Sequence, residues 1–227
     1  MPLLKIENIS KSFGERRLFE NLSLELETGK IYSLMGANGS GKTSLINIIS
    51  GFIKPDRGKI IFDNIEILLK APYQINKLGI ARSFQDLRLI NGLSVLDNLL
   101  VAMGNNKNRI PKFDEFVEAQ EILKKISLNN FAKKMGGEIS YGQQKLLTLG
   151  CCLANNPKLL LLDEPVAGID QINKIKIKEI VLTLKNEGIT VFQIEHDIEY
   201  IKDTSDVVFE LKENGLKAIN INNLNKI

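Results

Sequence analysis

Gly36-Ala37-Asn38-Gly39-Ser40-Gly41-Lys42-Thr43 is the stretch that decides the fold of this chain. It fits the phosphate-binding pattern G-x-x-x-x-G-K-[ST] at every fixed position. Glycines let such a loop turn tightly and approach phosphate oxygens, while its N–H groups point at the anion. In loops of this kind the lysine, here Lys42, reaches the β- and γ-phosphates, and the hydroxyl of Thr43 ligates Mg²⁺.

The sequence on either side of this loop supplies the setting that the pattern needs. Residues 31–35 form a short β-prone run, and residues 44–49 are a mostly apolar helix candidate, so a helix beginning near Gly41 adds the positive end of its dipole. The alternative, a glycine-rich turn that matches by chance, does not account for these flanks. The residues predicted to bind a nucleotide, ATP with Mg²⁺, are Gly36, Ala37, Asn38, Gly39, Ser40, Gly41, Lys42, Thr43 and Ser44.

Length and composition indicate one globular domain. The chain has 227 residues, of which 44% are hydrophobic and 25% are charged, as in ordinary globular proteins. Its net charge of +3 is too small to indicate a nucleic-acid partner.

No stretch approaches the roughly 18–20 apolar residues that span a bilayer, and no signal peptide is apparent. We therefore expect a cytoplasmic protein that reaches the membrane only through a partner.

The two cysteines, Cys151 and Cys152, are neighbours within an apolar helical run. Disulfide geometry disfavours a bond between adjacent cysteines, and no histidine or further cysteine stands near them. They are therefore expected to be packed thiols in a reducing compartment, with no redox or metal role.

Alternating strand and helix patterns predict an α/β fold. Strands are predicted at residues 3–9, 22–27, 59–62, 79–84, 159–162, 189–194, 206–211 and 216–221. Helices are predicted at residues 114–126, 141–153 and 172–186, and a polar break at 104–108 is expected to be a loop. Residues 86–137 are interpreted as a helical insertion.

Asp163 and Glu164 follow the apolar run 159–162. A buried parallel strand delivers such acids to the carboxyl edge of the sheet, where ligands bind in open α/β folds. Asp163 is placed to hold Mg²⁺ and Glu164 to polarise the attacking water. The alternative is a strand that ends in two solvated acids.

Further motifs occur in a fixed order along the chain. Ser140-Tyr141-Gly142-Gln143-Gln144 resembles the L-S-G-G-Q loop of the ATP-binding cassette (ABC) transporter ATPases, and residues 167–170 resemble their D-loop. Gln85, His196 and Phe13 resemble the Q-loop glutamine, the switch histidine and the aromatic residue that stacks on adenine. The chain is similar to an ABC transporter ATP-binding subunit over residues 3 to about 211.

This resemblance implies a P-loop NTPase core, RecA-like and mainly parallel, with an N-terminal antiparallel β subdomain and a helical insertion. One domain, 1–227, is expected, with residues 1–85 and 138–227 as its core and 86–137 as its helical subdomain. The implied catalytic residues are Glu164, His196 and Gln85, and the implied Mg²⁺ ligands are Thr43, Gln85 and Asp163. Phe13 and the Ser140, Gly142 and Gln143 of a second subunit are implied to contact ATP.

Three of these residues also have a simpler structural explanation. Ser140 is also an ordinary helix N-cap, which is compatible with a ligand role. His196, the only histidine, stands 32 residues after Glu164 as the family pattern requires, although lone histidines are more often packed or on the surface. Phe13 is equally suited to a core.

Further residues suggest which subgroup of the ABC transporter ATPases the chain resembles. Tyr141 departs from the common glycine, and this form, together with 81–85, Arg88-Leu89 and 93–99, resembles the ATPases of branched-chain amino-acid importers. The implied partners are transmembrane permease subunits, a second identical or related ATPase subunit and an extracytoplasmic solute-binding protein. A groove for a permease helix is expected after Gln85, lined by Leu87, Leu89 and Val95, unless these pack inside the helical insertion.

Two other classes of ATPase are less consistent with the chain. Soluble ABC ATPases of translation usually carry two cassettes, and those of DNA repair insert a long coiled coil, of which no heptad run is seen. A small kinase or GTPase does not explain the residues from Ser140 to Gln144. The leading prediction is an ATP hydrolase that drives a membrane transporter, and the alternative is a soluble ABC-type ATPase that is not tied to transport.

Overall fold

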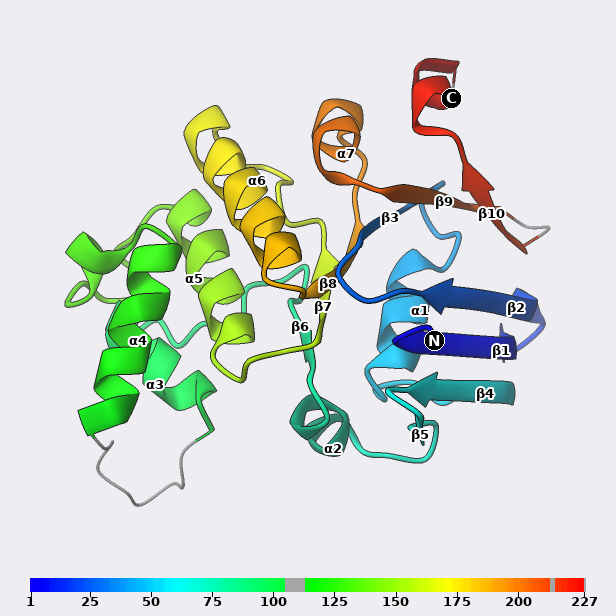
Figure 1. Ribbon diagram of the computed structural model, residues 1–227, viewed down its shortest axis with the longest axis horizontal. Coiled ribbons are helices and arrows are strands. Elements are labelled where there is room, and N and C mark those ends of the chain that lie inside the picture. Colours follow the sequence, from blue (N-terminus) through cyan, green and yellow to red (C-terminus); the bar gives the residue numbers. More distant parts are fainter. Residues whose placement is uncertain (105–112, 213–214, 227) are drawn as a thin grey trace.

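Two β-sheets and the helices packed on them organise the computed structural model, which describes residues 1–104, 113–212 and 215–226 (Figure 1). The antiparallel sheet has the order β2-β1-β4-β5, with strands β1 (Leu4–Phe13), β2 (Arg16–Leu26), β4 (Arg57–Phe62) and β5 (Ile65–Glu66). The larger sheet has the order β10-β9-β3-β8-β7-β6, with strands β3 (Ile31–Gly36), β6 (Ile80–Arg82), β7 (Leu159–Asp163), β8 (Thr190–Ile194), β9 (Val207–Lys212) and β10 (Gly215–Ile219).

Seven α-helices are found in the described residues: α1 (Lys42–Ile49), α2 (Pro72–Lys77), α3 (Val95–Ala102), α4 (Phe113–Lys125), α5 (Tyr141–Leu153), α6 (Gln171–Asn186) and α7 (Ile198–Thr204). Two short 3-10 helices cover Asn129–Phe131 and Ile221–Lys226. In the larger sheet only β10 runs antiparallel to its neighbour. The predicted α/β class, with a mainly parallel sheet and an antiparallel sheet near the N-terminus, is confirmed.

Strand β7 shows why the larger sheet is covered on both faces. All five of its residues are buried, and Leu159 and Leu161 belong to the core that contains α1 and the four-stranded sheet. Leu160 and Leu162 belong to the other core, with residues of α3, α4, α5 and α6. Because side chains alternate along a strand, an apolar run buries both faces of a central parallel strand. Figure 1 shows α1 and α5 on opposite sides of these strands.

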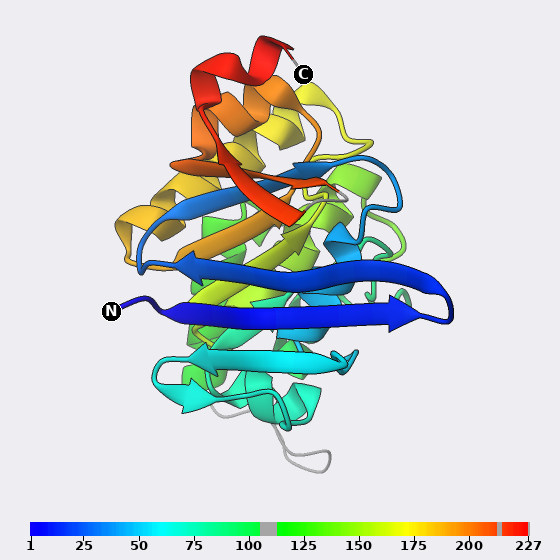
Figure 2. The same ribbon diagram turned by 90° about the vertical axis from the view of Figure 1, so that its right-hand side faces the viewer.

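The four-stranded sheet forms one side of the molecule, where β2, β1 and β4 run side by side (Figure 2). Strand β2 begins at Arg16, six residues before the predicted start, because it pairs with β1 as far as Phe13. Gly14 in the connecting turn has φ +59°, a left-handed conformation that suits glycine. The early part of β2 lacks a clear alternation of apolar residues, so pairing across the hairpin decides its length.

Other elements differ from the predictions at their ends. Strand β6 covers only Ile80–Arg82, and the chain then leaves the sheet, whereas a strand to residue 84 was expected. The last predicted strand ends at Ile219, before a 3-10 helix. Helices α2 and α7 were not predicted, since six and seven residues are too few to display a helical period. Apart from Gly104, the predicted loop at 104–108 lies outside the described residues.

The cysteines are packed, as predicted. Cys152 is buried, and Cys151 is partly buried beside α3, with its thiol near the carbonyl oxygen of Asn98. Burial raises the pKa of the Cys151 thiol to about 12 and raises that of Cys152 further. Burial therefore favours the protonated form of both thiols at neutral pH.

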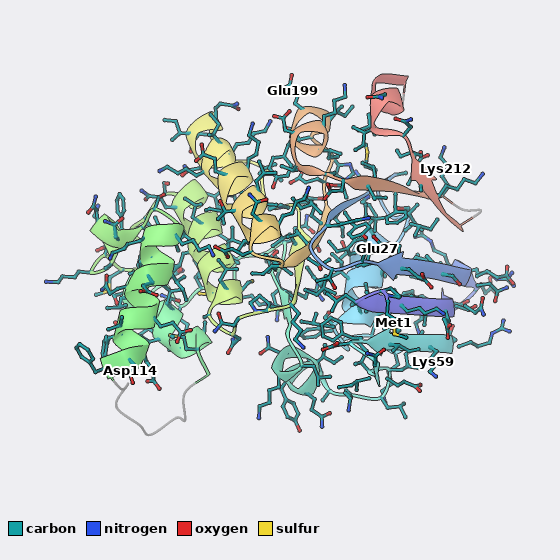
Figure 3. The ribbon with its side chains drawn as sticks, viewed as in Figure 1. Met1, Glu27, Lys59, Asp114, Glu199 and Lys212 are labelled. Carbon is teal, nitrogen blue, oxygen red and sulfur yellow. The ribbon has the colours of Figure 1, made fainter. Side chains whose placement is uncertain are left out.

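Charged side chains are distributed over the surface. Lys59, Asp114 and Glu199 are exposed on three separate elements and point outward (Figure 3). In the part of the chain that the structure describes, we find no helix with the length and apolarity needed to cross a membrane.

Candidate active site at the carboxyl edge of the parallel sheet

Four loops meet at one edge of the larger sheet because β3, β8, β7 and β6 are parallel neighbours. The phosphate loop follows β3, and the segment with Gln85 follows β6. Glu164 follows β7, and His196 follows β8 by two residues. The carboxyl edge of such a sheet is where ligands bind in open α/β folds, so residues spread over 160 positions of sequence are brought to one place.

The phosphate loop depends on glycine at two positions. Gly36 has φ +154°, and a Cβ atom placed there would lie 2.6 Å from the carbonyl oxygen of Leu211. Gly41, the N-cap of α1, has φ +105°, and its Cβ would lie 2.8 Å from Cγ of Leu18. Any other residue would push the loop away from β9 or β2, so the glycines fix a tight turn into the helix. The helix predicted after Gly41 is confirmed.

The side chain of Lys42 bonds to the backbone of this loop. Its side chain is buried, and its ammonium donates to the carbonyl oxygens of Gly36 at 2.7 Å and Ala37 at 3.0 Å. Burial lowers the pKa of Lys42, while the nearby carboxylates of Glu164 and Asp163 oppose that shift. The hydroxyl oxygen of Ser40 is buried without a hydrogen-bond partner among the described residues. An anion in the loop would offer partners to both groups.

Asp163 is a buried carboxylate with neither oxygen hydrogen-bonded to any described residue. Burial raises its pKa, and the guanidinium of Arg82 opposes this shift. The Thr43 hydroxyl also favours the charged form, from nearby but without hydrogen-bond geometry. A buried, unpaired carboxylate is costly unless a cation compensates it, and Mg²⁺ is commonly held by one or two carboxylates plus phosphate oxygens. Asp163 and Thr43 therefore fit the predicted Mg²⁺ site.

Asp163→Asn is expected to stabilise the nucleotide-free protein. Because folding raises the pKa of Asp163, the ionised group lowers stability once the pH exceeds its unfolded-state pKa of about 3.9. At pH 7 we expect the melting temperature to rise by roughly 2–4 °C, which corresponds to about 1 kcal/mol for a chain of this size. MgATP should then stabilise the variant less than the wild type.

Thermal unfolding with and without MgATP measures both effects. The matched control is Asp114→Asn, which removes an exposed carboxylate from the first turn of α4 and should therefore not raise the melting temperature or change the stabilisation by MgATP. A lower melting temperature for nucleotide-free Asp163→Asn than for the wild type would contradict the cost assigned to this carboxylate.

Glu164 and His196 lie side by side although 32 residues separate them. The Oε1 atom of Glu164 is 3.8 Å from Nε2 of His196, and both side chains are partly exposed. Glu164 has φ +52°, a left-handed conformation that is strained for a non-glycine residue and that recurs at functional sites. Its N–H donates to the carbonyl oxygen of Ile194 at 3.0 Å, which ties it to the end of β8. The reading of His196 as a packed residue is not supported.

Gln85 is exposed at the start of a loop that is held by cation–π contacts at its base. The ring centre of Phe84 lies 4.4 Å from the guanidinium of Arg82 and 3.5 Å from that of Arg88. Arg82 also donates to the Asn47 side chain at 2.6 Å, at the end of α1. These contacts join the Gln85 loop to the helix of the phosphate loop, and such cation–π contacts are typically worth about 0.5–2 kcal/mol each.

A hollow of about 810 Å³ lies beside the phosphate loop, between the start of β2 and the end of β9. The Arg16 guanidinium donates to the carbonyl oxygen of Gly39 at 2.8 Å within it. Phe13 is 49% exposed, with the Lys11 ammonium 5.2 Å from its ring centre, and it does not line the hollow. The reading of Phe13 as a core residue is therefore excluded, and its contact with adenine stays a prediction.

The Ser140 segment is engaged within its own helix. Ser140 is the N-cap of α5, accepts from the Gln143 N–H at 3.3 Å and donates its own N–H to the Gln143 side chain at 2.9 Å. Gly142 is packed against α6, where an added Cβ would lie 2.4 Å from the Asn173 amide nitrogen. The N-cap reading of Ser140 is confirmed. Tyr141, which replaces the common glycine, is 47% exposed and needs no room inside the fold.

Two buried charges at this edge were missed by the sequence reasoning. The Lys145 ammonium donates to the carbonyl oxygen of Glu164 at 2.8 Å, and burial lowers its pKa while Glu195 and Glu164 oppose this. Glu195, directly before His196, is buried with its carboxylate bound to backbone N–H groups. The only local signals were a lysine inside an apolar helix and an acid that ends a buried strand.

A second hollow, of about 240 Å³, lies between the Gln85 loop and the helices α3 and α5. Leu89 lines it, as predicted, together with Arg88 and Val101, which is 56% exposed. The prediction for Val95 is wrong, because Val95, the first residue of α3, is fully buried in the core. Leu87 is not among the lining residues.

This fold and site define a P-loop ATPase. A glycine-rich loop opens a helix at the carboxyl edge of a parallel sheet, and at the same edge strand β7 ends in an unpaired aspartate that is followed by a glutamate. The family model described as ABC transporter matches residues 19–167. The chain belongs to the ABC transporter family, and it is an ATP-hydrolysing ATPase of that family's transport type.

Known proteins resemble nearly the whole chain. The probable branched-chain amino acid transport ATP-binding protein LivG of Methanocaldococcus jannaschii is 37% identical over 220 residues, which are 92% of this chain and 86% of that protein. The crystal structure of the ADP conformation of MJ1267, an ATP-binding cassette of an ABC transporter, has a TM-score of 0.90 at 34% identity and covers 99% of this chain and 94% of that one. The dimeric post-hydrolysis state of the cassette MJ0796, bound to ADP and Pi, has a TM-score of 0.84 at 28% identity, over 96% and 98%.

Proposed function

We propose that this chain is the ATPase subunit of an importer for branched-chain or other hydrophobic amino acids. The assignment as an ATPase rests on one observation. Lys42, Asp163, Glu164 and His196 lie together at one edge of the sheet. The cargo is supported by the likeness to the LivG protein over 92% of the chain. As a part of an importer, the chain would sit at the cytoplasmic face of the membrane, held by permease subunits.

In this proposal each residue of the site has one role. The loop amides from Gly36 to Gly41, with Lys42, Thr43 and Ser44, hold the phosphates of ATP, and Phe13 stacks on adenine. Asp163, Thr43 and Gln85 would hold Mg²⁺, which when bound neutralises charge on the phosphate oxygens. Glu164 accepts a proton from the attacking water, and His196 contacts the γ-phosphate. The left-handed backbone of Glu164 supports this, because strain of this kind accumulates at functional sites.

The proposal also includes a second ATPase subunit, identical or related. Two cassettes close head to tail, so that Ser140, Gly142 and Gln143 of one subunit reach the nucleotide of the other. Ser140 heads a helix of 13 residues with its N-terminus exposed, and a helix N-terminus favours anions. The MJ0796 cassette, whose structure with ADP and Pi is dimeric, supports the presence of a second subunit.

The second hollow is proposed to receive a cytoplasmic helix of the permease. The single domain 1–227 is then divided into a core, 1–85 and 138–227, and a helical subdomain, 86–137, with the hollow at their boundary. Leu89, Ile90 and Val101 give it an apolar lining, and Ile90 and Val101 are about half exposed. Exposed apolar residues around a concave surface mark protein-binding sites. A solute-binding protein on the far side of the membrane completes the proposed importer.

Val101→Asp is expected to reduce co-purification with the permease at least about tenfold, since a charge would be buried in the interface. ATP binding by the isolated subunit should be unchanged, because Val101 is exposed and does not line the hollow beside the phosphate loop. Leu89→Asp should act in the same direction but also lower stability, since Leu89 packs on the core. Ile65→Asp on the edge strand β5 is the control, with a similarly exposed apolar side chain outside the hollow.

Co-purification from membranes with tagged permease subunits, followed by ATP-dependent uptake of leucine into vesicles, tests the proposed function. Normal co-purification of Val101→Asp would place the permease contact elsewhere. A chain that never associates with membrane subunits would support a soluble ABC-type ATPase instead. Association without leucine uptake would refute the cargo alone.

A further inference from the structure

Glu195 is a buried carboxylate that none of the roles above employs. It follows strand β8 and is 2% exposed. Its Oε1 atom accepts the N–H of Val166 at 2.9 Å, and its Oε2 atom accepts the N–H of His196 at 3.0 Å and that of Asp197 at 3.4 Å. One carboxylate therefore bonds to three backbone groups on two separate loops.

These two loops carry the two groups that meet in the site. Val166 is two residues after Glu164, on the loop that leaves β7, and His196 directly follows Glu195, on the loop that leaves β8. The bonds of Glu195 hold these loops at a fixed separation, and the side chains of Glu164 and His196 then stand 3.8 Å apart. In this arrangement the side chain of Glu195 does not need to contact the substrate.

A positive charge on the neighbouring helix lies near Glu195. Burial raises the pKa of Glu195, and the three N–H groups oppose that shift. The ammonium of Lys145, on α5, attracts the carboxylate and donates to the carbonyl oxygen of Glu164. Asp197 is the repulsive neighbour, and its own carboxylate is paired with Lys174. A charge kept in the interior at this cost needs a reason beyond packing.

We propose that Glu195 is a positioning residue for ATP hydrolysis, which sets the placement of His196 relative to Glu164 through the two loops. The inference rests on the proposed roles of Glu164 and His196. A displacement of a reacting or stabilising group by about 1 Å costs on the order of a hundredfold in rate. Loss of one anchor of the His196 loop is thus expected to lower kcat with little change in the KM for ATP.

A merely structural role differs from this in one measurable way. If Glu195 only satisfied buried N–H groups, its replacement would lower stability and would act on kcat independently of His196. If Glu195 acts through His196, its replacement matters only while His196 is present, because Glu164 keeps its own bonds to the Ile194 carbonyl oxygen and the Lys145 ammonium. Residues that act as a unit are non-additive in this way, and a double-mutant cycle measures it.

The cycle compares the assembled transporter carrying wild type, Glu195→Gln, His196→Ala and both changes. Glutamine keeps the shape and one acceptor oxygen but turns an NH₂ group toward backbone donors. We expect Glu195→Gln to lower kcat about tenfold or more, with KM within about twofold, and to have little further effect in the His196→Ala background. Gln193→Met is the control, because Gln193 is another buried polar residue of β8, bonded to Ser33 and Thr204 instead. It should lower the melting temperature and leave kcat unchanged.

Glu195→Asp keeps the cycle decisive if the glutamine variant does not fold. We expect the shorter carboxylate to keep a bond within its own loop, to the N–H groups of His196 or Asp197, and to lose the one to Val166, so kcat should fall less, again only with His196 present. An equal loss of kcat in both backgrounds overturns the inference, as does wild-type kcat in Glu195→Gln. If His196→Ala alone leaves kcat unchanged, the proposed role of His196 fails and this inference fails with it.

Discussion

Glu164→Gln is expected to bind ATP normally and to turn it over at least about a hundredfold more slowly than the wild type. The substitution keeps the shape of the side chain and removes its basicity, and a general base typically supplies about 10²- to 10⁴-fold in rate. Glu164 is suited to this role because its side chain is partly exposed beside His196 while its backbone is anchored on both sides. The anchors are the carbonyl oxygen of Ile194 and the ammonium of Lys145.

Steady-state ATPase activity of the transporter complex, with ATP binding by the isolated subunit, measures this effect. Glu199→Gln is the matched control, because it makes the same chemical change on an exposed residue of α7 (Figure 3). Turnover of Glu164→Gln within a few fold of the wild type would remove Glu164 from the proposed mechanism, although the fold and the family would stand.

Ser140→Arg is expected to abolish the ATP-dependent dimer. In the Glu164→Gln background, where hydrolysis is slow, ATP should produce a dimer and ADP should leave a monomer. An arginine at the start of α5 would place an uncompensated charge in the interface, which typically costs about 3–5 kcal/mol and weakens association more than a hundredfold. Binding of ATP to the monomer should be unaffected, because Ser140 bonds within its own helix and not to the phosphate loop of the same chain.

Size-exclusion chromatography with light scattering measures the oligomeric state. Ser140 also caps α5, so its replacement costs about 1 kcal/mol by itself. Ser94→Arg controls for that loss, because Ser94 caps α3 in the same way, by accepting the N–H of Asp97. An oligomeric state that is the same with ATP, ADP or neither would argue against the head-to-tail dimer.

The phosphate loop and the elements beside it were predictable because their signals are local. The turn at Gly36 to Gly41, the helix that begins at Lys42 and the apolar strand that ends at Asp163 each show their character within a few residues. Long helices such as α4 and α6 were placed to within a residue because several turns display the apolar period. Short elements such as α2 and α7 give no such period.

The lining of the second hollow was predicted only in part, for a related reason. Leu89 and Val95 are both apolar residues near Gln85, and composition does not distinguish a core position from a lining one. Packing of α3 against α4 and α5 buries Val95 completely and leaves Val101, on the same helix, at the surface. Which face of a helix is covered depends on its neighbours in space.

The sequence by itself determined the class of the protein, since a phosphate loop, an acidic strand end and the segment from Ser140 to Gln144 are read from adjacent residues. Only the tertiary structure decided which distant residues work together. The order β3-β8-β7-β6 places the loops of Glu164 and His196 side by side. There the Glu195 carboxylate accepts backbone N–H groups of both loops, and the Lys145 ammonium donates to the carbonyl oxygen of Glu164. Strand order and burial are non-local properties, so a charged residue in an apolar run shows its purpose only when its partners are seen.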